Sequence, residues 1–257
     1  MNIIISGYGK MGRLIEERAG ERGHGVVAIV DPALAGGASK TGAPGYGSLD
    51  DVQSGVLAKA DLALDFTHPS VAADNVKAFA GKKIPLVVGT TGWELSEVVQ
   101  AVKESGASLL YASNFSLGVN LFYRVAEYAA RLFDQFEEYD VAGFEAHHNR
   151  KADSPSGTAK AVAEILLKNM GRKKKVVYEM LDRPPAQDEL HFASVRVGAA
   201  PGAHTIYFDS PADTVEIVHT ARNREGLASG AIVAAEWLFK TVAAGGRGIF
   251  TFADVLG

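Results

Sequence analysis

Two adjacent histidines, a lysine and a Pro-Ser-Gly-Thr turn lie close together in the middle of the chain. The segment reads Glu145-Ala-His-His-Asn-Arg-Lys-Ala-Asp-Ser-Pro-Ser-Gly-Thr-Ala-Lys160. Imidazoles exchange protons near neutral pH, and a lysine adds a positive charge. Free backbone N–H groups at a helix start bind carboxylate or phosphate. The segment therefore combines proton carriers at His147, His148 and Lys151 with an anion cradle at Ser156-Gly157-Thr158.

Simpler interpretations of this segment are available. A strand, a polar loop and an N-capped helix would account for it, with the histidines merely hydrogen-bonded. A lysine and an anion cradle beside paired histidines exceed what capping needs, so we favour a chemical site. A metal site formed by His147, His148 and Asp153 is disfavoured, because adjacent residues of an extended segment point to opposite faces.

A glycine-rich motif begins the chain. Gly7-Tyr8-Gly9-Lys10-Met11-Gly12 lies between an apolar strand, Asn2–Ser6, and a predicted helix over 13–20. A second predicted strand over 25–30 follows and ends at Asp31, 19 residues after Gly12. This is the spacing of a dinucleotide-binding loop, in which the acid takes the ribose hydroxyls. A glycine turn in an unrelated α/β protein is the alternative.

Asp31 also bears on the choice of cofactor. A carboxylate at this position repels a 2′-phosphate, and the next residue is Pro32 rather than an arginine that would bind one. Lys10 and Arg13 could compensate in part. We therefore expect NADH to be preferred and NADPH to be used more weakly.

Alternating strands and helices predict the element that must position these groups. Predicted strands over 60–66, 84–88 and 108–112 are each followed by a polar loop and a helix, which is typical of a parallel, doubly wound sheet. Ligands of such sheets bind beyond the carboxyl ends of the strands. The residues expected there to form a floor under the nicotinamide ribose are Phe66, Thr67, Gly89, Thr90, Thr91, Ala112, Ser113, Asn114 and Phe115.

The pattern changes in the second half of the chain. Helices are predicted over 118–133 and 159–170, and alternating runs over 191–198, 204–209 and 214–220 predict an antiparallel sheet with one solvated face. An apolar sheet face left over in this way commonly packs against another subunit. We predict a Rossmann-type domain over 1–116 and 228–257 with an inserted α+β substrate and oligomerisation domain over 117–227 that contains a mixed or antiparallel sheet. Residues 33–54 are expected to form a surface loop.

Composition narrows the possible functions. The chain has 257 residues and a formal charge of −4, so no basic surface suggests nucleic acid. No apolar run approaches the ~20 residues of a membrane span, and no signal peptide is evident. The cytoplasm is therefore expected. The absence of cysteine excludes disulfides, thiolate metal ligands and the nucleophile of a semialdehyde dehydrogenase.

The chain resembles the 4-hydroxy-tetrahydrodipicolinate (dihydrodipicolinate) reductase family from its first residue nearly to its last. The motifs that carry the resemblance are the Glu145–Thr158 segment, Asp65-Phe-Thr, Gly89-Thr-Thr-Gly and Asn114-Phe-Ser-x-Gly-Val-Asn120. The resemblance implies NAD(P)H-dependent reduction of a cyclic imine dicarboxylate with loss of water, in lysine and diaminopimelate synthesis. It also implies a homotetramer assembled through the sheet of the substrate domain.

The resemblance further implies roles for individual residues. His147 and Lys151 correspond to the proton-transfer pair, and His148, Gly157 and Thr158 to ligands of the substrate carboxylates. A substrate-binding arginine would fall on Arg224, although Arg222 is close by. The glycine loop is shorter than in many members, and Pro32 replaces an arginine common there. Both departures concern the choice between NADH and NADPH.

Two other functions remain open from the residues alone. One is another Rossmann reductase of amino-acid metabolism, such as an aspartate dehydrogenase. The other is a dinucleotide sensor without turnover, which would have no use for His147, His148 and Lys151. For the reductase, our hypothesis is that Lys151 donates the proton and that His147 orients or relays it.

Overall fold

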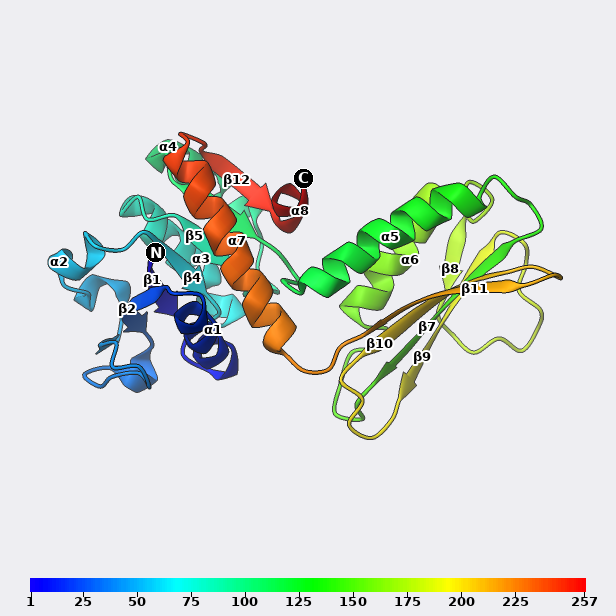
Figure 1. The fold of residues 1–257 in the computed structure, drawn as a ribbon, viewed down its shortest axis with the longest axis horizontal. Coiled ribbons are helices and arrows are strands. Elements are labelled where there is room, and N and C mark those ends of the chain that lie inside the picture. The colour runs from blue at the N-terminus through cyan, green and yellow to red at the C-terminus, as the bar shows by residue number, and fades with distance from the viewer. The chain divides into compact units, whose positions relative to one another are not determined.

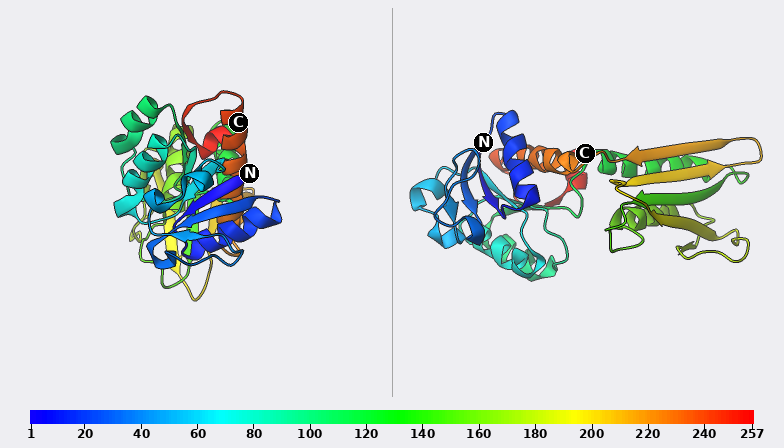
Figure 2. Two further views of the ribbon diagram at one scale, coloured as in Figure 1. Left: turned by 90° about the vertical axis from the view of Figure 1, so that its left-hand side faces the viewer. Right: turned by 90° about the horizontal axis from the view of Figure 1, so that it is seen from below.

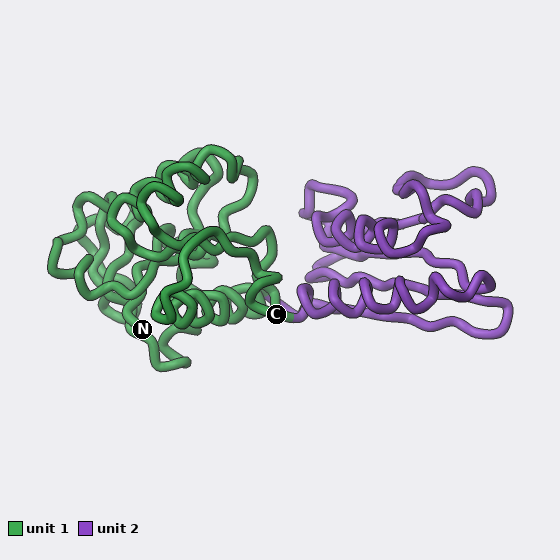
Figure 3. The backbone as a smooth tube through the Cα atoms, turned by 90° about the horizontal axis from the view of Figure 1, so that it is seen from above, with its two compact units in different colours: residues 1–117, 224–257 green, residues 118–223 purple.

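The computed structural model describes residues 1–257, which divide into two compact units (Figure 3). Unit 1 consists of Met1–Leu117 and Arg224–Gly257, and unit 2 consists of Gly118–Asn223. Unit 1 is therefore built from both ends of the chain.

Unit 1 contains a parallel sheet of seven strands in the order β12-β6-β5-β4-β1-β2-β3 (Figure 1). Successive strands run outward from β1 in both directions, so the strand order reverses beside β1. Ligands of doubly wound sheets bind at such a reversal. The strands are β1 (Asn2–Ser6), β2 (Gly25–Val30), β3 (Gly45–Tyr46), β4 (Leu62–Asp65), β5 (Leu86–Val88), β6 (Ser108–Tyr111) and β12 (Gly248–Thr251).

Helices cover both faces of this sheet (Figure 2). Because side chains alternate along a strand, Ile3 and Ile5 of β1 pack with α1 (Lys10–Glu21) and α7 (Glu225–Ala243). Ile4 packs on the other face with α3 (Pro69–Gly81) and α4 (Ser96–Ser105). Burial on both faces explains the continuous apolar runs of these strands.

One segment of unit 1 is more regular than expected, and the C-terminal segment adds a strand and a helix to the unit. Residues 33–54, expected as a surface loop, include the edge strand β3 and the short helices η1 (Pro32–Leu34) and η2 (Leu49–Asp51), followed by α2 (Ser54–Leu57). These elements are too short to give a periodic pattern. The chain ends in β12, which pairs with β6, and α8 (Phe252–Leu256).

Helix α7 is the one helix long and apolar enough to cross a membrane by length and composition alone, with a mean hydropathy of 1.2. The sequence pattern had predicted no such segment. Ala228, Ala231, Ala235 and Leu238 of this helix are buried in the core of unit 1. A core helix of a globular unit accounts for this composition.

Unit 2 contains a five-stranded sheet in the order β11-β10-β7-β9-β8. Helices α5 (Leu117–Phe133) and α6 (Gly157–Asn169) form one core with Phe192, Ile206 and Phe208 on a single face, the helix-covered face. The strands are β7 (Asp140–His147), β8 (Lys175–Val177), β9 (Glu189–Arg196), β10 (Ala203–Asp209) and β11 (Thr214–Thr220).

The sheet of unit 2, predicted to be mixed or antiparallel, is mixed. Strand β10 pairs antiparallel with β7 and β11, but β9 pairs in parallel with β7 and β8. Strands β9 and β10 are consecutive in the chain and lie on opposite sides of β7. An alternating pattern fixes which residues share a face but not which strand is the neighbour. The predicted fold class, a Rossmann-type parallel sheet with an inserted α+β unit, is confirmed.

Candidate active site

The glycine loop of unit 1 connects β1 to α1 where the strand order reverses. A Cβ on Gly12 would lie 2.1 Å from the carbonyl oxygen of Gly7, and Gly7 itself adopts φ +87°. Gly9 is different, because a Cβ there would have no neighbour within 4 Å and its φ of −76° suits any residue. Gly7 and Gly12 are therefore required by the fold, whereas a side chain at Gly9 would enter open space.

Asp31 contacts this loop directly. Its Oδ2 accepts a hydrogen bond from the backbone N–H of Tyr8 at 2.6 Å, and its Oδ1 accepts one from Ala33 at 2.9 Å. The guanidinium of Arg13 lies 5.3 Å from the centre of the Tyr8 ring. Lys10 is exposed and Met11 is half-buried at the start of α1. The structure thus brings the predicted ribose acid to the predicted pyrophosphate loop.

Buried Asp65, at the end of β4, ties two of the strand-end loops together. Its Oδ1 accepts hydrogen bonds from the hydroxyls of Thr90 at 2.7 Å and Thr67 at 2.9 Å, and Oδ2 accepts one from Asn75 at 2.8 Å. The backbone N–H of Thr67 also donates to the Thr90 hydroxyl at 2.8 Å. The sequence motif contained Asp65, but we did not assign it a role.

The other predicted cofactor residues lie at the same edge of the sheet. The Phe66 and Phe115 rings are 5.8 Å apart, and a Cβ on Gly89 would lie 2.1 Å from the Phe66 ring. Thr91 is exposed, Ala112 and Ser113 follow β6, and Asn114 Oδ1 accepts a hydrogen bond from Ser116. These loops therefore form one contiguous surface beyond β4, β5 and β6.

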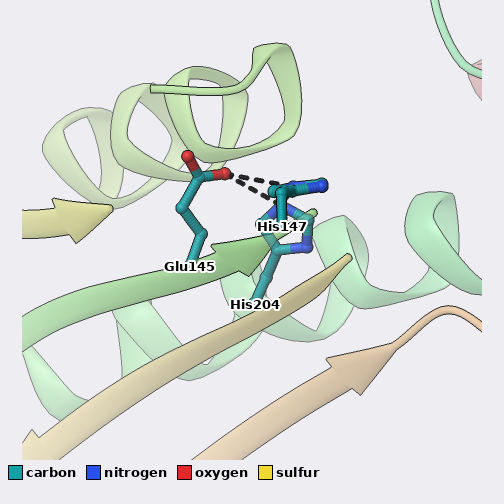
Figure 4. Close-up of side chains that lie close together, drawn as sticks. All are labelled: Glu145, His147 and His204. Atoms are coloured by element: carbon teal, nitrogen blue, oxygen red, sulfur yellow. Dashed lines mark hydrogen bonds and ion pairs between the residues drawn. The ribbon is translucent and has the colours of Figure 1, made fainter. Parts of the chain in front are cut away.

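In unit 2, strand register brings polar residues from distant parts of the sequence together. Glu145 on β7 is the register partner of Ser194 on β9 and of His204 on β10. His147, two residues later on the same face, is the partner of Arg196. All of them lie on the helix-covered face, and Figure 4 shows Glu145, His147 and His204 converging there.

Glu145, which is fully buried, organises this cluster. Its Oε1 accepts hydrogen bonds from the Ser194 hydroxyl at 2.8 Å, the Ser156 backbone N–H at 3.0 Å and the Arg196 guanidinium at 3.1 Å. Burial opposes ionisation, but hydrogen bonds from His204, Ser156 and Ser194 outweigh it and hold the pKa of Glu145 well below its usual range. The carboxylate is therefore ionised.

The predicted anion cradle begins α6. The Ser156 hydroxyl accepts a hydrogen bond from the Ala159 N–H at 3.1 Å and caps the helix. Gly157 is exposed, with nothing within 4 Å of a Cβ, while the Thr158 hydroxyl is hydrogen-bonded to Tyr123. Because the Ser156 N–H also binds Glu145, this carboxylate connects the helix start to the histidines.

The remaining predicted residues have separate surroundings. The Lys151 ammonium pairs with Asp153 at 2.7 Å, and this pairing lowers the pKa of Asp153. His148 accepts a hydrogen bond from the Lys151 N–H through its carbonyl, and its ring is outside the Glu145 cluster. Arg224 belongs to unit 1, directly before α7.

The imidazole of His147 is mostly buried, with 12% of its side chain exposed. Burial lowers the pKa of His147; the Glu145 carboxylate raises it, whereas the positive charges of Lys151 and Arg196 lower it further. A neutral imidazole at neutral pH follows.

Sequence reasoning missed Glu145, Ser194, Arg196 and His204 as site residues. Glu145 could have been found, because it precedes His147 by two residues in a predicted strand and so shares its face. The other three come from strands whose register could not be inferred from their own patterns.

Comparison with known proteins agrees with this architecture. Two family models match the chain: the N-terminal part of dihydrodipicolinate reductase at residues 1–115 and its C-terminal part at residues 118–256. A protein of Christiangramia forsetii named 4-hydroxy-tetrahydrodipicolinate reductase is 36% identical over 260 residues, covering 100% of this chain and 98% of that protein.

Solved structures resemble the fold. Dipicolinate-bound dihydrodipicolinate reductase from Paenisporosarcina sp. TG-14 superposes with a TM-score of 0.78 at 21% identity, covering 98% of this chain and 97% of that one. An engineered D-amino acid dehydrogenase bound to NADP+ gives a TM-score of 0.59 at 16% identity, with coverage of 100% and 96%.

Proposed function

This chain belongs to the dihydrodipicolinate reductase family, and from that premise we propose how its two units divide the reaction. The protein reduces 4-hydroxy-tetrahydrodipicolinate to tetrahydrodipicolinate with loss of water, in lysine and diaminopimelate biosynthesis. In our proposal unit 1 is the dinucleotide-binding domain, and unit 2 binds the substrate and forms the oligomer.

The reaction requires groups that bind the carboxylates of the substrate and one group that donates a proton. Loss of the ring hydroxyl with a neighbouring hydrogen as water leaves a conjugated cyclic imine that carries two carboxylates. A bound nicotinamide dinucleotide supplies the hydride. In our proposal the backbone N–H groups and side chains at Ser156, Gly157 and Thr158, together with His148, hold a carboxylate. Arg224 remains a proposed further partner of the substrate.

We assign the proton donor to Lys151 and an orienting or relaying role to His147. Burial lowers the pKa of His147 and favours its neutral form, whereas Lys151 forms an ion pair with Asp153 at 2.7 Å. The observation that carries this assignment is the Glu145 carboxylate, which connects the His147 ring at 3.3 Å to the N–H of the helix cap. His147 and the anion cradle thus share one carboxylate.

The direct test measures the oxidation of NADH through its loss of absorbance. The substrate is generated in situ from pyruvate and aspartate semialdehyde. Turnover supports the assignment. NADH binding without turnover would favour the dinucleotide sensor or a different imine substrate.

We propose that NADH is preferred over NADPH. The Asp31 carboxylate, which accepts a hydrogen bond from the glycine loop, would meet the adenosine ribose in our proposal. Removing this charge by Asp31→Asn is expected to raise the ratio of kcat/KM for NADPH over NADH about tenfold, or ~1.4 kcal/mol. Asp31→Asn also disturbs the hydrogen bonds that the Asp31 carboxylate accepts from the loop, and this affects the binding of both cofactors. Only the ratio of the two kcat/KM values therefore reports on repulsion between the carboxylate and the 2′-phosphate. An unchanged ratio would remove Asp31 from cofactor choice.

We propose a cytoplasmic homotetramer that uses the sheet face opposite the helices of unit 2. Val195 and Val218 project from this face and are 42% and 55% exposed. The change Val218→Glu is expected to lower the mass measured by sedimentation, because it buries a charge at the interface. Val71→Glu on α3, at a position 43% exposed, is the control and should keep the mass. A monomeric wild-type chain would contradict the proposal.

A further inference from the structure

Lys151, the proposed proton donor, lies in a polar loop between β7 and α6. This loop spans residues 148–155; none of them is buried and most are exposed. A segment that buries no residue is held in place mainly by its hydrogen bonds. The position of the Lys151 ammonium therefore depends on the contacts that the loop makes with the sheet of unit 2.

The two ends of the loop are fastened to the sheet. Where the chain leaves β7, the backbone N–H of Asn149 donates to the carbonyl oxygen of Gly198 at 3.2 Å. Where it enters α6, the backbone N–H of Ser156 donates to the Glu145 carboxylate at 3.0 Å. Between these ends, no backbone-to-backbone hydrogen bond joins residues 150–155 to a strand. The part of the loop that carries Lys151 must be held by a side chain.

The guanidinium of Arg196, the last residue of β9, makes this connection. Its Nη2 donates to the carbonyl oxygen of Asp153 at 2.6 Å and to Oε1 of the fully buried Glu145 at 3.1 Å. Its Nη1 donates to the carbonyl oxygen of Val195 at 2.9 Å. One planar group thus joins the loop to the buried carboxylate, and the contact with Val195 limits its rotation.

Asp153 extends this connection to Lys151. Its carbonyl oxygen accepts the hydrogen bond from Arg196, and its carboxylate pairs with the Lys151 ammonium at 2.7 Å. The hydrogen bond with Lys151 lowers the pKa of Asp153, and the charge of Arg196 lowers it further. A chain of contacts therefore runs from the buried Glu145 through Arg196 and Asp153 to the proposed proton donor.

We propose that Arg196 is a positioning residue for the proton donor: its guanidinium, anchored on Glu145, holds the Asp153 carbonyl and thereby the Lys151 ammonium where the substrate is protonated. The proposal rests on the proposed role of Lys151 and names the residue that fixes its position. Arg196 needs no contact with the substrate, because its terminal nitrogens bind protein oxygens and its Nε is buried.

The shape of the guanidinium is the property that this role requires. A planar fork donates in fixed directions, whereas the ammonium of a lysine is a point charge on a flexible stem. Arg196→Lys therefore keeps the charge and loses the fork. This variant is expected to lower kcat about 10²-fold, the loss that a displacement of about 1 Å can cause, and to change KM for the imine and for NADH by about threefold or less.

A comparison of single and double variants tests whether Arg196 acts through Lys151. Arg196→Lys is measured in the wild-type chain and in the Lys151→Met chain. Since Lys151→Met has already removed the proton donor, Arg196→Lys is expected to cause no further loss of kcat there. A second loss of about 10²-fold in the Lys151→Met chain would show that Arg196 acts independently of Lys151. That result would overturn the proposal.

The pH profile distinguishes an effect on position from an effect on charge. Burial lowers the pKa of His147, Glu145 raises it, and the charges of His204, Lys151 and Arg196 lower it further. Arg196→Lys keeps its charge, so the acidic limb of kcat/KM should stay where the wild type has it. Arg196→Gln removes the charge and should move this limb to higher pH. A limb that moved in Arg196→Lys would attribute the loss of kcat to charge and reject the positioning role.

Arg183→Lys is the matched control. Arg183 also binds a buried carboxylate of the same sheet, because its two terminal nitrogens each donate to Glu189 at 2.7 Å. Its contacts do not include the 148–155 loop, so the variant is expected to keep the kcat, the KM values and the pH profile of the wild type. Should Arg196→Lys fail to fold, Arg196→Gln, whose amide can still donate to Glu145, replaces it in the comparison with Lys151→Met.

The outcomes for Lys151 and Arg196 separate this inference from the proposed function. Near-wild-type turnover of Lys151→Met would reject Lys151 as the donor, and the inference with it. A loss of turnover in Lys151→Met together with wild-type kcat in Arg196→Lys would reject the positioning role alone. A loss in both single variants, with no further loss in the double variant and an unmoved acidic limb in Arg196→Lys, is the result expected.

Discussion

Replacing Lys151 with methionine is expected to lower kcat about 10³-fold, within the range measured for loss of a general acid, while the dissociation constant for NADH stays about the same. The ammonium is the proton source in our assignment, and methionine keeps much of the side-chain length without a charge. His147 cannot replace it at neutral pH, because burial lowers the pKa of His147 and leaves the ring neutral. Rapid-mixing kinetics and a separate NADH titration measure the two quantities.

Lys168→Met is the matched control for this variant. Lys168 is an exposed lysine in the last turn of α6, so its loss changes the net charge equally but leaves the 145–158 segment intact. Asp153→Asn removes the ion-pair partner of Lys151 at 2.7 Å and should lower kcat by a smaller factor than Lys151→Met. Near-wild-type turnover of Lys151→Met would refute the donor assignment.

The parallel sheet of unit 1 could be predicted because its signals are local. A strand buried on both faces is a continuous apolar run, and Asn2–Ser6 reads that way before any neighbour is known. The glycine loop follows within the same short segment, and Asp31 ends the next strand. Parallel strands then bring their carboxyl-end loops to one edge without further information.

The histidine cluster of unit 2 could be predicted only in part, because half of it depends on register. Glu145 and His147 share a face by their spacing alone, but the approach of His204 requires that β10 pair with β7 and that residue 204 lie opposite residue 145. The alternating patterns of β9 and β10 predict which side chains share a face of the sheet, but they do not indicate which strand pairs with which. For the same reason the alternating runs, interpreted as an antiparallel arrangement, did not indicate that β9 pairs in parallel with β7.

Gly9→Ala is expected to weaken NADH binding roughly 10–100-fold and to leave the thermal stability of the cofactor-free protein nearly unchanged. In this structure a Cβ on Gly9 would meet nothing within 4 Å, and the φ of −76° suits alanine. If a pyrophosphate approaches the backbone there, the added methyl group overpacks the complex by about 1–3 kcal/mol, which corresponds to that loss of affinity. Isothermal titration with NADH and thermal unfolding measure the two effects.

Variants at two other glycines of the same segment distinguish an effect on NADH binding from an effect on the stability of the fold. Gly12→Ala would place its Cβ 2.1 Å from the carbonyl oxygen of Gly7, so it should lower both stability and binding. Gly20→Ala, in the last turn of α1 with nothing within 4 Å of the added Cβ, should raise stability by at most about 0.5–1 kcal/mol and leave NADH binding unchanged. If Gly9→Ala instead bound NADH as the wild type does, the open space at Gly9 would not be the pyrophosphate position. The cofactor would then have to approach unit 1 through the loops beyond β4, β5 and β6 without using this part of the glycine loop.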